Sequence, residues 1–218
     1  MKQLNLDTKI REALAQRIFT SLEDAAPGST VQLRGSLAEG NADAYSDIDV
    51  LWEVPDELFQ MSVDLIAEIL SEAQTLESLR SAPDFQNSDK RRLFFVQFAD
   101  TPLFWRADID VFAESVQRDP EYDLHNEAAR GNDWSPTHSA LMNAIAAVKA
   151  LLRHKEDTAR QLLIRGFERV GLDVPEGSSQ ELILKLAEGV AAMDSTKAAL
   201  AYRIVELHQQ VFGQVEAA

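Results

Sequence analysis

The apolar residues of this chain change their spacing near residues 120–134. Before that point, short runs of branched and aromatic residues, typical of strands, alternate with segments of helical spacing. After it, every apolar stripe has helical spacing. Mixed elements followed by helices alone are typical of an α+β protein with a separate helical part. We therefore expect an α+β fold, with a small mixed-sheet domain over residues 1–120 and a helical bundle over residues 121–218.

Local signals place the elements of both parts. In the first part we expect helices at 7–24 and 56–76, strands at 31–34 and 47–52, and a hairpin formed by 92–98 and 103–112. In the second part, Ser135 before Pro136 is a typical helix start, and Ser178 with Glu181 has the spacing of a capping box. Four apolar stripes predict four helices there.

The charge of the chain restricts its partners. Lys and Arg number 21 against 36 Asp and Glu, which gives a formal net charge of −15. A protein that binds a phosphate backbone needs a basic surface, because counterion release drives that binding. We therefore expect no long nucleic acid as a partner. A cationic small molecule or a basic protein fits the sign of the charge better.

Two further features bear on location. The chain has no cysteine, which excludes a disulfide framework and a thiolate metal site. No apolar run approaches the roughly eighteen residues that cross a bilayer, and the first residues lack the apolar core of a signal peptide. We expect a cytoplasmic protein that does not associate with a membrane.

Paired carboxylates give the first indication of chemistry. Asp47 and Asp49 lie two positions apart on a predicted strand, so both side chains leave the same face. Neighbouring carboxylates repel one another, and a divalent cation relieves the repulsion. Magnesium typically takes one or two carboxylates together with phosphate oxygens of a substrate. One strand earlier, the turn at Gly35 and Ser36 offers backbone N–H groups and a hydroxyl to a phosphate.

A second acidic pair lies on the last predicted strand. Arg106, Asp108 and Asp110 share one face of that strand, opposite its apolar residues. In the same sheet, one of the two aspartates could complete a three-carboxylate site with Asp47 and Asp49. Three carboxylates suit two metal ions about 3.5–4 Å apart. The pattern leaves Asp108 and Asp110 open as the third ligand, with a slight preference for Asp110, and the other could serve as general base. Arg106 is expected to pair with one of them.

The segment from Gly35 to Asp49 resembles the signature of the DNA polymerase beta–like nucleotidyltransferase superfamily, a Gly-Ser turn, ten residues and then Asp-x-Asp. It is most similar to a small bacterial branch with the aminoglycoside, lincosamide and minimal nucleotidyltransferases, through Ala38, Gly40, Ala42 and the run 46–49. The resemblance implies transfer of a nucleoside monophosphate from a nucleoside triphosphate, expected to be ATP, to a hydroxyl. It also implies magnesium held by Asp47, Asp49 and a third carboxylate, and a triphosphate held by Gly35 and Ser36. We take Asp110 as the preferred third ligand and expect two Mg²⁺ ions.

The same resemblance suggests the acceptor and the place of the site. We expect a small, hydroxyl-bearing and cationic acceptor, such as an antibiotic of the aminoglycoside or lincosamide type, bound between the two domains. The alternative is an antitoxin or protein-modifying enzyme that acts on a partner protein; a degenerate, non-catalytic domain is a further possibility.

The charges around the motif depart from the family pattern. Many relatives have arginine where this chain has Glu39, and the segment from Gly35 to Leu79 holds eleven acidic residues and no Lys or Arg. The triphosphate then needs metals or cations from elsewhere, and the candidates are Arg34, Arg106, Lys90, Arg91, Arg92, Lys149 and Arg153. Of these we retain Lys149 as a nucleotide-binding residue. The cluster at 90–92 is interpreted as a solvated start of a loop.

Overall fold

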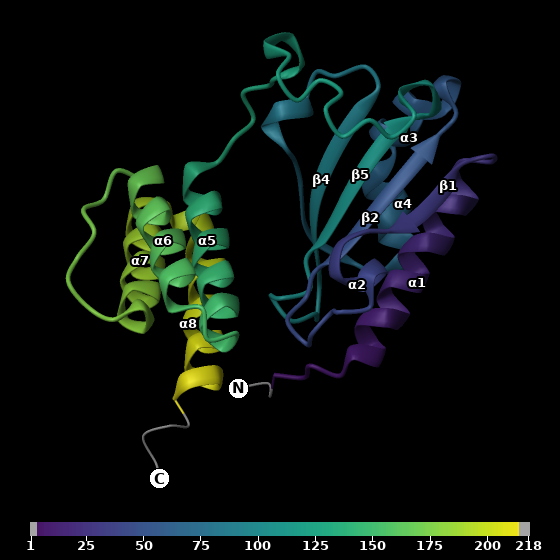
Figure 1. The fold of residues 1–218 in the computed structure, drawn as a ribbon. Coiled ribbons are helices and arrows are strands. Elements are labelled where there is room, and N and C mark those ends of the chain that lie inside the picture. Colours follow the sequence, from purple (N-terminus) through teal and green to yellow (C-terminus); the bar gives the residue numbers. More distant parts are fainter. Residues whose placement is uncertain (1–3, 214–218) are drawn as a thin grey trace. The chain divides into compact units, whose positions relative to one another are not determined.

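The computed structural model describes residues 4–213, and its chain forms two compact units (Figure 1). One is Leu6–Trp134, and the other joins the residues from Ser135 onward to those before Leu6. The division falls later than the boundary predicted between residues 120 and 121. The connecting residues stay with the sheet, because Asn87 N donates to Ala129 O at 2.8 Å and Gly131 N donates to Pro83 O at 2.9 Å.

The first unit contains a mixed five-stranded sheet in the order β1-β2-β5-β4-β3. The strands are β1 (Thr30–Leu33), β2 (Ile48–Val54), β3 (Leu76–Ser81), β4 (Arg91–Phe98) and β5 (Ala107–Ala113). β2 and β5 run parallel, and every other neighbouring pair is antiparallel. The expected α+β class and the mixed sheet are confirmed.

Helices cover one face of this sheet (Figure 1). They are α1 (Thr8–Ala25), α3 (Phe59–Asp64) and α4 (Ile66–Ala73), while the short α2 (Gly35–Glu39) follows β1. The core joins the apolar stripe of α1 to alternate residues of the two central strands, among them Leu14, Ile18, Ile48, Val50, Ile109 and Val111. Because side chains alternate along a strand, the intervening residues of β2 and β5, which include the aspartates, belong to the opposite face.

Three local predictions need correction. The strand β3 was not expected, because residue 76 was assigned to the preceding helix and the strand shows no regular alternation of buried and exposed residues. The helix predicted from Asp56 is interrupted near Leu65, where α3 ends and α4 begins. The last strand begins at Ala107 rather than at residue 103, because Trp105 N donates to Pro102 O at 3.0 Å and closes a turn there.

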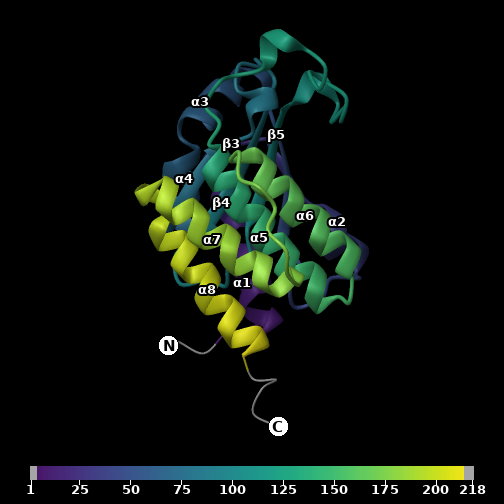
Figure 2. The same ribbon diagram turned by 90° about the vertical axis from the view of Figure 1, so that its left-hand side faces the viewer.

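The second unit is the predicted four-helix arrangement (Figure 2). Its helices are α5 (Pro136–Leu152), α6 (Glu156–Arg169), α7 (Ser179–Met193) and α8 (Ala198–Phe212). Ser135 caps α5 by accepting from His138 N at 3.1 Å, and Ser178 with Glu181 forms the capping box of α7. Both predicted helix starts are therefore confirmed.

Short 3-10 turns complete the described chain, and they are η1 (Asp56–Leu58), η2 (Pro83–Phe85), η3 (Glu114–Val116), η4 (Glu127–Ala129) and η5 (Ser195–Lys197). Across residues 4–213, no helix combines the length and the apolar character needed to cross a membrane.

Candidate active site

The two halves of the sequence motif touch one another. Arg34 N donates to Asp49 O at 2.8 Å, which continues the pairing of β1 with β2. Gly35 has a φ of +57°, and a Cβ built on it would lie 2.5 Å from Asp49 Oδ2. The Asp49 carboxylate therefore lies directly against the Gly35 backbone, where only glycine leaves enough room. Gly35 and Ser36 begin α2, and the Ser36 hydroxyl makes no hydrogen bond within the described residues.

The loop before β2 is held from inside the molecule. Asp43 Oδ1 accepts from Tyr45 N at 2.9 Å and from Ser46 Oγ at 3.0 Å. Arg11 of α1 is only 2% exposed, and its Nη1 donates to the carbonyl oxygens of Asp43 and Ser46. Sequence reasoning missed this arginine, although it occupies the buried helical stripe together with Leu14. Arg11 thus fixes the segment that leads into Asp47.

We expect Arg11→Met to destabilise the protein by about 2–4 kcal/mol, because one buried and one partly buried carbonyl oxygen would lose a charged donor. Arg17→Met, on an exposed part of the same helix, removes hydrogen bonds to Ala73 O and Gln74 Oε1 and should cost less than about 1 kcal/mol. Urea unfolding followed by circular dichroism measures both changes. Equal losses in the two variants would contradict the role given to Arg11.

The register of the central strands brings the two acidic segments together. β2 and β5 are neighbours, with Asp49 opposite Asp108 and Leu51 opposite Asp110. The prediction that a late strand places an aspartate beside the Asp-x-Asp pair is therefore observed in the sheet. The residue directly beside Asp49 is Asp108, and Asp110 lies one alternation further along the strand.

Asp108 is bound by Arg106, which confirms the expected ion pair. The guanidinium donates Nε to Oδ1 and Nη2 to Oδ2, each at 2.6 Å. Burial lowers the pKa of Arg106, but the carboxylates of Asp108, Asp47 and Asp49 together raise it above the ordinary value for arginine. Three carboxylates thus act on the same positive charge.

Arg80 is a second cation on this side of the sheet that sequence reasoning did not find. It lies opposite Phe95 of β4, which in turn lies opposite Asp108. The guanidinium carbons of Arg80 and Arg106 lie 5.5 Å and 4.7 Å from the Phe95 ring centre. Burial, together with the charge of Arg106, lowers the pKa of Arg80 to about 10. Arg80 could have been found as the one basic residue of β3, but that strand was not predicted.

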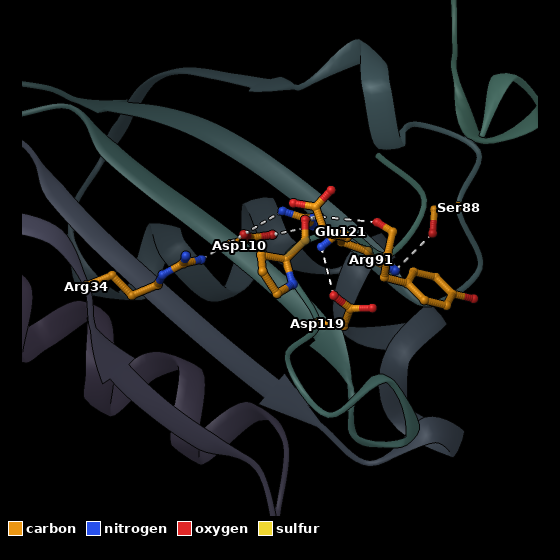
Figure 3. A network of polar contacts seen from close by, with 8 residues as sticks. Arg34, Ser88, Arg91, Asp110, Asp119 and Glu121 are labelled. Atoms are coloured by element: carbon orange, nitrogen blue, oxygen red, sulfur yellow. Dashed lines mark hydrogen bonds and ion pairs between the residues drawn. The ribbon is translucent and has the colours of Figure 1, made fainter. Parts of the chain in front are cut away.

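Asp110 belongs to a separate network (Figure 3). It is 6% exposed and accepts from Arg91 Nε at 3.2 Å, from Arg91 Nη2 at 3.1 Å and from Arg34 Nη1 at 3.1 Å. Burial raises the pKa of Asp110 above the ordinary value for aspartate, although Arg91 and Arg34 act to lower it. The prediction of a solvated loop at 90–92 is wrong for Arg91, which is also 6% exposed. Arg91 shares with Leu93 and Phe95 the face of β4 that lies opposite the helix-covered core. It is buried there by long-range contacts with Phe85 and Pro120, which no local pattern indicates.

The carboxylates of this site are of the chemical type that binds a divalent cation. Carboxylate oxygens are the ligands that magnesium prefers, and Asp49 and Asp108 lie opposite one another on neighbouring strands, with Asp47 two positions before Asp49. Within residues 4–213, however, no three Asp, Glu or His side chains are gathered closely enough to hold a metal ion. The carboxylates of Asp108 and Asp110 are paired with arginines. The structure therefore brings together the strands that carry the predicted ligands.

Lys149, the remaining predicted residue, lies on α5 of the second unit and is 8% exposed. Its role in nucleotide binding, like a site between the two units, stays a prediction.

Comparison with known proteins identifies part of the chain. Residues 15–93 match the family described as "Nucleotidyltransferase domain", a range that includes Gly35, Ser36, Asp47 and Asp49. No curated protein matches the sequence.

Solved structures show only distant likeness. The GLD-2/RNP-8 complex matches at 13% identity over 85% of this chain and 78% of that chain, with a TM-score of 0.38. Cid1, described with RNA terminal uridylyl transferase activity, matches at 16% identity over 81% of this chain and 45% of the Cid1 chain, with a TM-score of 0.38. The polymerase core of TRAMP matches at 11% identity over 84% of this chain and 58% of that chain, with a TM-score of 0.37.

Proposed function

Because this chain carries a nucleotidyltransferase domain of the DNA polymerase beta–like superfamily, we propose that it transfers a nucleoside monophosphate, from ATP in the first instance, to a hydroxyl of a small acceptor. The observation that carries the proposal is the placement of Asp49 against the Gly35 backbone and opposite Asp108 on the neighbouring strand. Such a placement suits a reaction in which carboxylates, cations and phosphates meet at one point.

Two Mg²⁺ ions would be held by Asp47, Asp49 and Asp108. When bound, they supply acidification of the acceptor hydroxyl and neutralisation of the leaving pyrophosphate. We assign Asp108 in place of the initially preferred Asp110, because the register sets Asp108 beside Asp49. Asp110 is instead enclosed by Arg91 and Arg34, which also makes it unsuitable as the general base.

The chain itself contributes contacts to the triphosphate. Gly35 lets the backbone come close to a phosphate, and the Ser36 hydroxyl can donate to one. Lys149 stays a candidate for a further contact. Arg106 counterbalances Asp108 while the cations are absent.

The charge of the chain supports the proposed kind of acceptor. Its net charge of −15 repels a polynucleotide backbone and attracts a cationic molecule. Between Arg17 and Arg80 the sequence has one basic residue, Arg34, so the segment around the motif is strongly acidic. We therefore propose a polyol or amino-sugar acceptor, of which aminoglycoside and lincosamide antibiotics are examples.

The test is incubation of the purified protein with each α-³²P-labelled nucleoside triphosphate, Mg²⁺ and a panel of aminoglycosides and lincosamides. A short RNA and a cell extract provide the competing acceptors. We expect label on a small molecule and release of pyrophosphate. Label on RNA or on a polypeptide would overturn the small-molecule acceptor, and label on a polypeptide would support the partner-protein alternative. Absence of any transfer would overturn the proposal as a whole.

We expect Asp108→Asn to lower kcat by about 10²–10³-fold and to raise the Mg²⁺ concentration that half-saturates the reaction, because a charged ligand is lost. The amide oxygen can still accept from Arg106, so the fold should persist. Glu53→Gln is the matched control, since Glu53 is held by Arg118 in a similar two-bond ion pair. An unchanged Mg²⁺ dependence in Asp108→Asn would exclude Asp108 as a ligand.

A further inference from the structure

We propose that Asp110 is a positioning residue, which holds the Arg34 guanidinium over the sheet beside Gly35 so that Arg34 binds the phosphates of the nucleoside triphosphate. The inference rests on the proposed nucleotidyl transfer and assigns a polyphosphate contact to the network of Figure 3.

Arg34 is placed where a triphosphate needs a cation. It directly precedes Gly35, whose backbone contacts the Asp49 carboxylate. It is also the single basic residue between Arg17 and Arg80, in a segment otherwise rich in carboxylates. Its side chain starts at the end of β1 and reaches the third strand in order, β5, where Nη1 lies 3.1 Å from Asp110 Oδ2. The guanidinium therefore extends over β2, the strand that carries Asp49.

Arg34 keeps donors for a ligand. Its side chain is 44% exposed, and within the described residues its other guanidinium nitrogens make no hydrogen bond. An arginine offers five N–H donors in a fork that matches phosphate oxygens. One contact to Asp110 thus fixes the group and leaves the remaining donors directed to solvent.

Asp110 is held rigidly enough to act as this anchor. Arg91 binds both of its oxygens, and the Arg91 guanidinium carbon lies 4.0 Å from the Phe85 ring centre and 4.7 Å from that of Phe112. Arg91 Nη1 also donates to Pro120 O at 2.6 Å and to Tyr122 O at 3.2 Å. Asp110 and Arg91 are therefore fixed by packing and hydrogen bonds on several sides, which pre-organises Arg34.

The charge balance of the trio favours an anion. Two guanidinium groups share one carboxylate, so the trio carries a net positive charge. Arg91 is buried, with 8% of its side chain exposed, and Arg34 is the member that reaches solvent. The pair of Asp108 with Arg106 is different, because one carboxylate there balances one guanidinium. A negative ligand beside Gly35 would therefore meet the positive charge of the trio at Arg34.

The test compares the binding of ATP and adenosine to the full-length protein by isothermal titration calorimetry in the presence of Mg²⁺. Arg34→Gln should weaken ATP binding about tenfold, as expected for the loss of a charge-assisted hydrogen bond, and Arg34→Lys should restore part of it. Asp110→Asn should weaken it several-fold. Adenosine binding should change in none of them. Arg118→Gln is the control, because it breaks an arginine–carboxylate pair elsewhere on the sheet.

The kinetic readout separates the inference from a metal-ligand role. Asp110→Asn should raise KM for ATP and leave the Mg²⁺ dependence of transfer as in the wild type. ATP affinity unchanged in both Arg34→Gln and Asp110→Asn would overturn the inference, as would a raised Mg²⁺ requirement in Asp110→Asn. Arg34 is half-exposed, so its variants should fold and keep the test decisive. A wild-type protein that binds no ATP would instead overturn the proposed function, and this inference with it.

Discussion

Asp49→Asn is expected to lower kcat for nucleotidyl transfer by at least about 10³-fold, which corresponds to roughly 4 kcal/mol of transition-state stabilisation. Asp49 is the aspartate that joins the two parts of the proposed site. Its carboxylate lies against the Gly35 backbone, and its strand position is opposite Asp108. Replacement by the isosteric amide removes one negative charge from the group that attracts cations, without changing the volume of the side chain.

Pyrophosphate release and transfer of label measure this effect, and circular dichroism confirms that the variant is folded. Asp64→Asn serves as the matched control, because Asp64 ends α3 and its side chain accepts an exposed hydrogen bond from Gln60. Its kcat should stay within about twofold of the wild type. Pyrophosphate release that persists unchanged in Asp49→Asn would remove Asp49 from the site and with it the proposed placement of the cations.

Local patterns account for what the sequence predicted well. The alternation of Asp47 and Asp49 with apolar residues follows from the geometry of a single strand, and so does that of Asp108 with Asp110. Helix starts at Ser135 and Ser178 depend on hydrogen bonds within four residues. The α+β class follows from the sum of such signals, which the comparison with the nucleotidyltransferase domain supports.

Contacts between residues far apart in the chain account for what the sequence could not predict. Arg34 meets Asp110 across 76 positions and Arg11 meets Ser46 across 35, and no local pattern encodes either contact. The choice between Asp108 and Asp110 depends on the register of β2 against β5. A shift of two residues preserves the face of every side chain but exchanges the aspartate beside Asp49. The charge of Arg91 also led to a wrong prediction, because it was taken as solvated although Asp110, Phe85 and Pro120 enclose it.

Gly35→Ala is expected to lower kcat by about 10²-fold or more, through the close approach of Gly35 to Asp49 that the structure shows. The new Cβ would lie 2.5 Å from Asp49 Oδ2, so the carboxylate has to move away from the turn. A displacement of about 1 Å at a reacting centre can cost such a factor. The φ of +57° adds backbone strain of about 1–2 kcal/mol, which lowers stability as well.

Gly40→Ala separates the two effects. Gly40 also has a positive φ, +72°, but a Cβ there would meet no atom within 4 Å. This variant should therefore lose a similar 1–2 kcal/mol or so of stability and keep its kcat within a few-fold of the wild type. Thermal unfolding and steady-state kinetics on the two variants, side by side, measure strain and displacement independently. If both glycine variants lost activity equally, the close approach of Gly35 to Asp49 would have no role of its own, and the loss would reflect the strained backbone of the loop.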